Sequence, residues 1–107
     1  MANGTFSQQD IKHLLNNYRQ KLEAANIKIN DIYVYGSYAK GTQHEYSDID
    51  ICVVSPDFQD RVESTMTLMK LRDDSELALS PIAFSQKTFV DENPLAWEIK
   101  QTGVIFK

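Results

Sequence analysis

Apolar residues recur every three or four positions near the start of the chain. This period predicts an amphipathic helix over residues 8–25. The apolar positions are Ile11, Leu14, Leu15, Tyr18, Leu22 and Ala25. Ser7 immediately precedes the segment, and Asp10 comes three residues after Ser7. The pair predicts an N-cap with a capping box. Residues 1–6 are expected to form a loose tail.

Three later segments have the character of strands. Residues 31–35 (DIYVY) and 48–54 (DIDICVV) are rich in β-branched and aromatic side chains. Residues 76–84 (ELALSPIAF) alternate sufficiently to form a third strand. Pro81 lacks an N–H group, and this predicts that the third strand lies at an edge of the sheet or near a strand end.

Helical segments separate these strands. The spacing of Val62, Met66 and Met69 predicts a helix near residues 58–72. Pro94 begins a further helix that ends at Gly103, and Trp97 on that helix is expected to anchor the core. Residues 104–106 form either a last short strand or an ordered tail. This order predicts an α/β (α+β) fold with a small mixed sheet packed against helices.

Composition narrows the classes of protein further. The chain has 107 residues, which suits one domain over residues 1–107, and its net charge of −4 disfavours non-specific nucleic-acid binding. Cys52 is the only cysteine, so an internal disulfide is excluded. No apolar stretch approaches the ~20 residues of a membrane span, and no signal peptide is visible. These features predict a cytoplasmic protein.

Two aspartates in the second expected strand are candidate metal ligands. Asp48 and Asp50 are two residues apart, so both carboxylates point to one face of a strand. Like charges this close repel unless a cation lies between them, and Mg²⁺ prefers such oxygen ligands together with water and phosphates. The alternative is a strand end whose acidic residues simply face water.

A glycine-containing turn follows the first expected strand. Gly36 permits a sharp turn and a close approach of phosphate. If a short helix starts at Ser37, its N–H groups and the Ser37 hydroxyl can donate to that phosphate. Gly41 is then a turn or C-cap glycine. The alternative is a plain strand-to-helix turn in which Ser37 is the N-cap.

Together these residues resemble a known signature. A Gly-Ser turn after one strand, a second glycine five residues on, and an Asp-x-Asp strand soon afterwards are similar to the motif of the DNA polymerase beta-type nucleotidyltransferases. The resemblance is greatest to the minimal nucleotidyltransferase (MNT) domain proteins of bacteria and archaea. The motif covers residues 32–54, and the order of elements extends the similarity over most of the chain.

The resemblance implies a site and a mechanism. Gly36, Ser37, Lys40 and Gly41 would bind the phosphates of a nucleoside triphosphate, with ATP as the expected donor. Asp48 and Asp50 would hold two Mg²⁺ ions, for which Mn²⁺ could substitute. The reaction would transfer a nucleoside monophosphate to a hydroxyl and release pyrophosphate. The alternative for Lys40 is a solvated surface lysine.

The third carboxylate of the family is not evident. In the frame set by Pro81, Pro94 and Gly103, the acid would fall at position 80, which is Ser80. Glu76 is the only acid within the expected strand and is therefore the candidate, on the same face but ~13 Å further back. An exposed glutamate at the strand start is the alternative reading of Glu76.

Two functions remain open at this point. The first is a nucleotidyltransferase whose acceptor surface comes from a second copy in a homo-oligomer or from a partner. The resemblance implies a small helical partner of the HEPN type, with this chain acting as an antitoxin in a toxin–antitoxin pair. The second is a weakened or inactive module that binds a nucleotide or a partner, which Ser80 favours.

Overall fold

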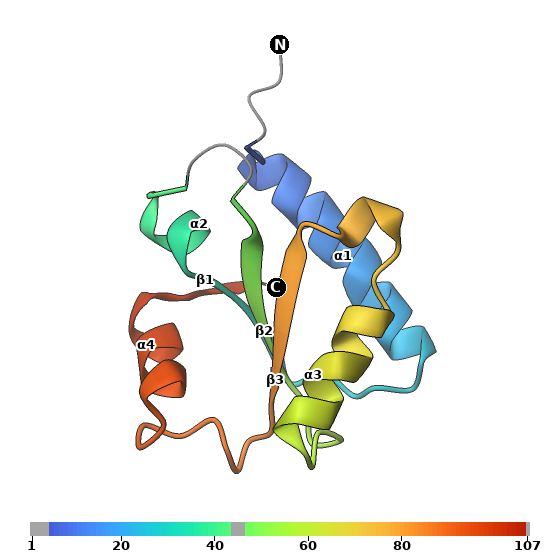
Figure 1. Ribbon diagram of the computed structural model, residues 1–107, viewed down its shortest axis with the longest axis vertical. Helices are drawn as coiled ribbons and strands as arrows, with labels where there is room; N and C mark the ends of the chain where they lie inside the picture. The colour runs from blue at the N-terminus through green and yellow to red at the C-terminus, as the bar shows by residue number, and fades with distance from the viewer. Residues whose placement is uncertain (1–4, 44–46, 107) are drawn as a thin grey trace.

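A computed structural model describes residues 5–43 and 47–106. It contains a four-stranded mixed sheet in the order β3-β2-β1-β4 (Figure 1). β1 pairs antiparallel with both β2 and β4, whereas β2 pairs parallel with β3. The strands are β1 (Asp31–Tyr35), β2 (Ile49–Val54), β3 (Leu79–Phe84) and β4 (Val104–Phe106). The expected class, a small mixed sheet packed against helices, is confirmed.

Helices cover both sides of this sheet. α1 and α3 lie on one side, and α4 lies on the other, with the short α2 at one end (Figure 1). The helices are α1 (Gln8–Ala24), α2 (Ser37–Lys40), α3 (Arg61–Lys70) and α4 (Pro94–Thr102), and η1 (Asp74–Glu76) is a 3-10 turn. None of the helices in the described part of the chain is long and apolar enough to cross a membrane.

Alternation along β2 divides the core into two parts. Ile49, Ile51 and Val53 are fully buried with side chains of α1 and α3. Cys52 and Val54 point the other way and join a second cluster with residues of α4. By the same alternation, Asp50 lies on the α4 side of the sheet.

The first helix begins as the sequence predicts. Asp10 N–H donates to Ser7 Oγ at 3.0 Å, and Ser7 N–H donates to Asp10 Oδ2 at 3.1 Å, so the capping box is confirmed. The loose tail is wrong at Phe6, which packs on the core and donates its N–H to Tyr38 Oη at 2.9 Å. Positions 1–4 of the expected tail lie outside the described residues.

Two expected boundaries and one expected core residue differ from the structure. The helix expected near 58–72 begins at Arg61, because Asp60 Oδ1 caps it by accepting from Glu63 N–H at 2.9 Å. The third strand begins at Leu79 and not at Glu76, because η1 forms in between. The expectation that Trp97 anchors the core is also wrong, since half of that residue is exposed.

Side chains of α3 and the turn after it bind the outer edge of β3. Ala83 N–H donates to Thr65 Oγ1 at 3.0 Å, and Arg61 Nε donates to Ala83 O at 3.1 Å. Arg72 donates to Leu79 O at 2.7 Å. These contacts fix the rotation of α3 about its own axis.

An ion pair between the partly exposed Lys21 and the buried Glu76 joins α1 to η1. Glu76 is buried, and its Oε1 accepts from Lys21 Nζ at 2.6 Å and from Asp73 N–H at 3.0 Å. Lys21 Nζ also contacts Asp73 Oδ2 at 2.8 Å. Hydrogen bonds to the two carboxylates raise the pKa of Lys21. The pair therefore holds the Glu76 side chain against α1, and its role there is to link η1 to that helix.

We expect Lys21→Met to lower the free energy of unfolding by about 2 kcal/mol, because the Glu76 carboxylate would stay buried without its ammonium partner. Chemical denaturation measures the change. Lys12→Met on the exposed side of α1 is the matched control, with an expected change below about 0.5 kcal/mol. Equal effects of the two substitutions would contradict a structural role for the pair.

Candidate functional site

The end of β1 makes a sharp turn into α2. Gly36 has φ +73° and ψ −148°, a conformation that residues with a Cβ atom rarely adopt. Ser37 is the first residue of α2, so the expected short helix is confirmed. Gly41 caps the other end in the left-handed conformation, with φ +73°. The first N–H groups of a helix lack intrahelical partners, and here they follow directly after Gly36.

Gly36 lies against the carboxylate of Asp50. A Cβ atom built on Gly36 would overlap Asp50 Oδ2, well inside van der Waals contact. Tyr35 is the cross-strand partner of Asp50 in the β1–β2 pair, so the residue after it necessarily comes close to this carboxylate. The turn and the aspartate pair thus form one site, and only glycine fits at position 36.

Asp48 and Asp50 lie close enough to interact. Asp48 immediately precedes β2 and is exposed, whereas Asp50 is half-buried. Burial and then the negative charge of Asp48 raise the pKa of Asp50. The two carboxylates therefore repel each other, and a bound cation would relieve that repulsion.

Tyr35 and Ser80 lie on either side of Asp50. Ser80 is its neighbour on β3, and Tyr35 is its neighbour on β1. Burial and then the charge of Asp50 raise the pKa of Tyr35, so its hydroxyl keeps its proton. Position 80 is thus beside the aspartate pair, as the family frame implies, but a serine occupies it.

Lys40 reaches across from α2 to α4. Its Nζ lies 3.7 Å from Glu98 Oε2, and both side chains are about half exposed. Exposed ion pairs of this kind contribute little to stability. The Lys40 ammonium is therefore only weakly held by Glu98.

Glu76 does not join this site. It lies in η1 and pairs with Lys21 of α1, on the side of the sheet opposite to Asp50. Two expectations for Glu76, a strand position on the Asp50 face of the sheet and an exposed glutamate at the strand start, are both wrong, because the chain forms the Asp73-capped turn before β3 begins and buries this side chain. Among the described residues, no group of three or more His, Cys, Asp or Glu side chains is arranged to hold a metal ion.

Two neighbours of the site are not among the residues predicted from the sequence. Tyr35 ends β1 directly before Gly36, and the pairing of the two strands places it beside Asp50. Glu98 gave no comparable signal, because its contact with Lys40 depends on how α4 packs over the sheet. Local motifs disclose strand neighbours more readily than contacts between distant helices.

Comparison with known sequences gives a consistent pattern. The nucleotidyltransferase domain family profile matches residues 14–103. The protein adenylyltransferase MntA of Shewanella oneidensis is 46% identical over 52 residues, which is 48% of this chain and 37% of that protein. A candidate protein adenylyltransferase of Methanocaldococcus jannaschii is 46% identical over 44 residues, which is 41% of this chain and 50% of that protein. The matches thus span half or less of these relatives.

Solved structures share the fold. A candidate nucleotidyltransferase from Sulfolobus solfataricus superposes with a TM-score of 0.65 over 98% of this chain and 91% of that chain, at 17% identity. A toxin–antitoxin structure with AMP-PNP superposes with a TM-score of 0.55 over 85% of this chain and 71% of that chain, at 29% identity. The fold and the matched family agree.

Proposed function

Because this chain belongs to the nucleotidyltransferase domain family, we propose that it binds a nucleoside triphosphate, with ATP as the donor, and transfers the nucleoside monophosphate to a hydroxyl. The observation that carries this proposal is the contact of Gly36 with the Asp50 carboxylate. The contact supports the proposal because the turn that would bind phosphate then lies beside a carboxylate that would bind a metal ion.

The donor set fits Mg²⁺. Asp48 and Asp50 offer hard carboxylate oxygens, and Mg²⁺ is commonly held by one or two carboxylates together with water and substrate phosphates. Mn²⁺ would bind the same oxygens. Bound there, the metal would neutralise phosphate charge and activate the attacking hydroxyl. The raised pKa of Asp50 supports this assignment, because a cation would relieve the repulsion that causes it in part.

The residues of the turn would bind the triphosphate. Gly36 leaves space for a phosphate oxygen, and Ser37 adds a hydroxyl donor to the N–H groups of α2. Lys40 would leave Glu98 and contribute a positive charge, while Gly41 ends the helix. Attack of a hydroxyl oxygen on the α-phosphorus would form one P–O bond. The bond between the α-phosphorus and the oxygen that bridges it to the β-phosphorus would break, and pyrophosphate would leave.

The acceptor is proposed to be a hydroxyl of a partner protein. Two relatives carry the name protein adenylyltransferase, one of them as a candidate, and similar structures are described as toxin–antitoxin complexes. One of those complexes carries two aspartate-to-glutamate substitutions two residues apart, the same spacing as Asp48 and Asp50. A small helical protein of the HEPN type is the partner that we propose.

Paramagnetic NMR tests the donor site without knowledge of the acceptor. Mn²⁺ should broaden the backbone amide signals of residues 36–41 and 48–50, and ATP should enhance the broadening. Scattered broadening that ATP does not change would overturn the proposed site. Transfer of label from α-labelled ATP to a co-purified helical protein would then test the acceptor separately.

The second candidate is a module that binds nucleotide or a partner but turns over slowly. Ser80 favours it, because the neighbour of Asp50 on β3 lacks a carboxylate. Loss of that acid would leave no third ligand for a metal and no carboxylate to remove the proton from the attacking hydroxyl. Binding would survive while transfer would be slow.

We expect Ser80→Glu to raise the transfer rate by about tenfold or more, because a general base beside the reacting groups typically contributes at least that factor. Label transfer measures it under single-turnover conditions. Gln86→Glu, in the exposed turn after β3, adds the same charge away from the site and should leave the rate unchanged. An unchanged rate in Ser80→Glu would show that the missing acid does not limit turnover.

A further inference from the structure

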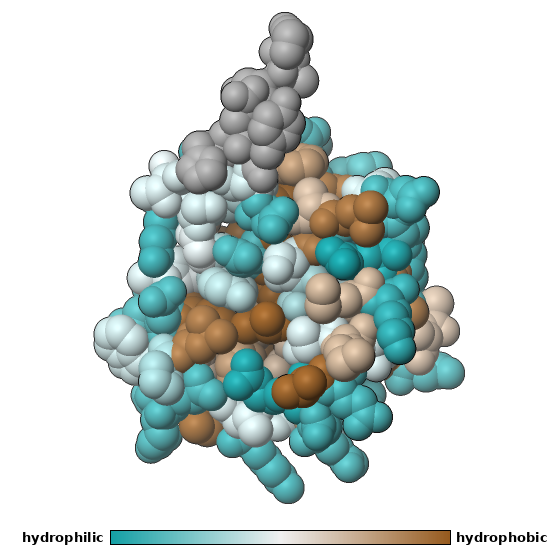
Figure 2. All heavy atoms as spheres, viewed as in Figure 1, coloured by the Kyte–Doolittle hydropathy of each residue, from teal (hydrophilic) through white to brown (hydrophobic). Residues whose placement is uncertain are grey.

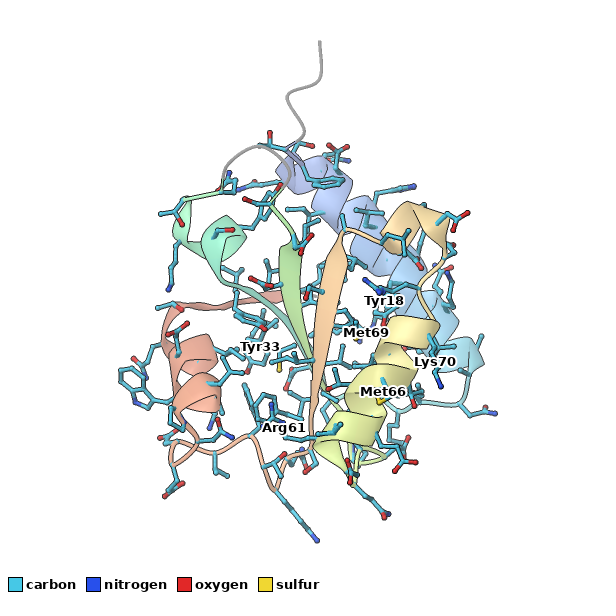
Figure 3. The ribbon with its side chains drawn as sticks, viewed as in Figure 1. Tyr18, Tyr33, Arg61, Met66, Met69 and Lys70 are labelled. Atoms are coloured by element: carbon cyan, nitrogen blue, oxygen red, sulfur yellow. The ribbon has the colours of Figure 1, made fainter. Side chains whose placement is uncertain are left out.

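An apolar stripe is exposed along α3. Val62, Met66 and Met69 follow one another at spacings of four and three, so they share one face of the helix. They are 72%, 52% and 44% exposed. Figure 2 shows brown and pale-brown atoms over this part of the surface, and Figure 3 shows Met66 and Met69 on α3, on the side of the molecule away from α4. Apolar side chains gathered in this way mark interaction surfaces.

The stripe cannot turn inward. Arg61 and Thr65 hold α3 to the edge of β3, and Leu68 is fully buried beneath it. Each residue of the stripe comes one position after one of these three, which places it about 100° further round the helix. The core already occupies the inner face, so within the described part of the chain no other element covers the stripe.

Opposite charges flank the stripe at its two ends. Glu63 and Lys70 each follow a stripe residue by one position, so they lie on the same flank of α3. Both are exposed, and within the described ranges neither takes part in an ion pair. They are separated by seven positions and lie almost symmetrically about Met66.

We infer that α3 forms the interface of a symmetric dimer, in which it packs antiparallel against α3 of a second copy. A twofold axis near Met66 puts the two Met66 side chains together and Val62 beside Met69 of the other copy. The same axis keeps the charged flanks of the two helices on one side of the interface. Glu63 of each copy then lies beside Lys70 of the other copy, which gives two ion pairs. The stripe and the charges are thus both self-complementary.

The charges favour the antiparallel arrangement. In a parallel twofold pair the flank that carries Glu63 and Lys70 lies on opposite sides of the interface in the two copies, so the attraction between Glu63 and Lys70 is lost. α3 also lies on the side of the sheet opposite to Asp50, so the dimer leaves both candidate sites open (Figure 1).

Analytical ultracentrifugation tests the dimer. The wild-type chain should show a concentration-dependent monomer–dimer equilibrium, and Met66→Asp should weaken it at least about tenfold by putting a charge at the twofold axis. Glu63→Lys and Lys70→Glu should each weaken it by about tenfold, because each turns two attractions into two repulsions. The double variant Glu63→Lys/Lys70→Glu should recover the wild-type Kd. Lys87→Glu, on an exposed turn, is the control for charge reversal and should change nothing.

A cysteine cross-link tests the position of the axis. Met66→Cys should form a disulfide-linked dimer on mild oxidation. Glu63→Cys should link more slowly, because its two copies would be offset by roughly 9 Å along the helices. Cys52 does not interfere, since it is fully buried.

The results separate the possibilities. A wild-type chain that remains monomeric, a dimer that tolerates Met66→Asp, or a double variant that does not recover would each overturn the proposal. A dimer lost on Ile105→Asp instead would assign the interface to the β4 edge and would equally overturn it. Nucleotide binding should be unchanged in all of these variants, so the proposed function is tested independently.

Discussion

Asp50→Asn and Asp48→Asn should each remove metal-dependent binding of ATP while leaving the fold intact. The two carboxylates are the proposed ligands, and an amide neither carries the charge nor binds Mg²⁺ as tightly. The loss should exceed the roughly 10–100-fold typical of changes to groups around a metal, because these side chains would contact it directly. Titration calorimetry with Mg²⁺ and a non-hydrolysable ATP analogue measures the affinity.

Asp31→Asn is the matched control for these two variants. Asp31 is exposed at the far end of β1, where it pairs with Val54, so its removal should leave the affinity unchanged. In the absence of metal, Asp50→Asn should be at least as stable as wild type at neutral pH. In the wild type the folded-state pKa of Asp50 is raised, so the charged carboxylate lowers the free energy of unfolding at pH values above that pKa. The stability difference between wild type and Asp50→Asn should therefore vanish in acid. Unchanged affinity for Mg²⁺–ATP in both site variants would refute the site.

Gly36→Ala should lower both stability and nucleotide binding, and its loss of stability should exceed that of Gly41→Ala. Both glycines have φ +73°, so the backbone strain of an alanine is the same, about 1 kcal/mol. They differ in what the new Cβ atom meets. At Gly36 it overlaps Asp50 Oδ2, whereas at Gly41 no atom of the described residues beyond its chain neighbours lies within 4 Å. We expect Gly36→Ala to cost about 2 kcal/mol more than Gly41→Ala, a value typical of overpacking.

A double variant identifies the cause. Gly36→Ala/Asp50→Ala removes the carboxylate that the new methyl group overlaps, so it should recover most of the extra stability loss without recovering binding. Urea unfolding measures the stability of each variant. Equal losses in the two glycine variants would contradict the close contact between the turn and Asp50.

Much of the fold could be predicted because its signals are local. Ser7 and Asp10 cap α1 through hydrogen bonds between neighbours in sequence, and Asn93 and Pro94 begin α4 in the same way. Pro81 predicted an edge strand, and β3 lies at an edge. These caps act between residues close together in the sequence, so the starts of α1 and α4 could be predicted from the sequence.

The remaining differences have a tertiary origin. Glu76 was expected within the third strand, on the Asp50 face of the sheet or exposed at the strand start. It is instead buried against α1, where Lys21 from a distant helix compensates its charge. Trp97 was expected in the core, yet Ala96 and Ile99 are the residues of α4 that face the sheet. The exposure of Trp97 does not follow from local spacing, because it depends on which face of α4 meets the sheet. The turn that removes Glu76 from the strand does have a local signal, the capping box of Asp73 and Glu76.

Some residues of the candidate site could likewise be predicted from the sequence, and others could not. Gly36, Asp48 and Asp50 come from one adjacent pair of strands, and their proximity followed from alternation and turn chemistry. Tyr35 could have been added from the same pairing. The contact of Lys40 with Glu98 could not, since 58 positions separate the two residues and only the docking of α4 brings them together.

The outer edge of β3 has a consequence for how the protein resists aggregation. An edge strand normally offers N–H and C=O groups to a strand of another molecule. Here Pro81 has no N–H group, Thr65 and Arg61 bind both backbone groups of Ala83, and Arg72 binds Leu79 O. Strand addition at β3 would first have to break these bonds. The side chains that orient α3 therefore also prevent a strand of another molecule from pairing with the sheet. Loss of Thr65 or Arg61 would expose an edge from which fibrils can extend.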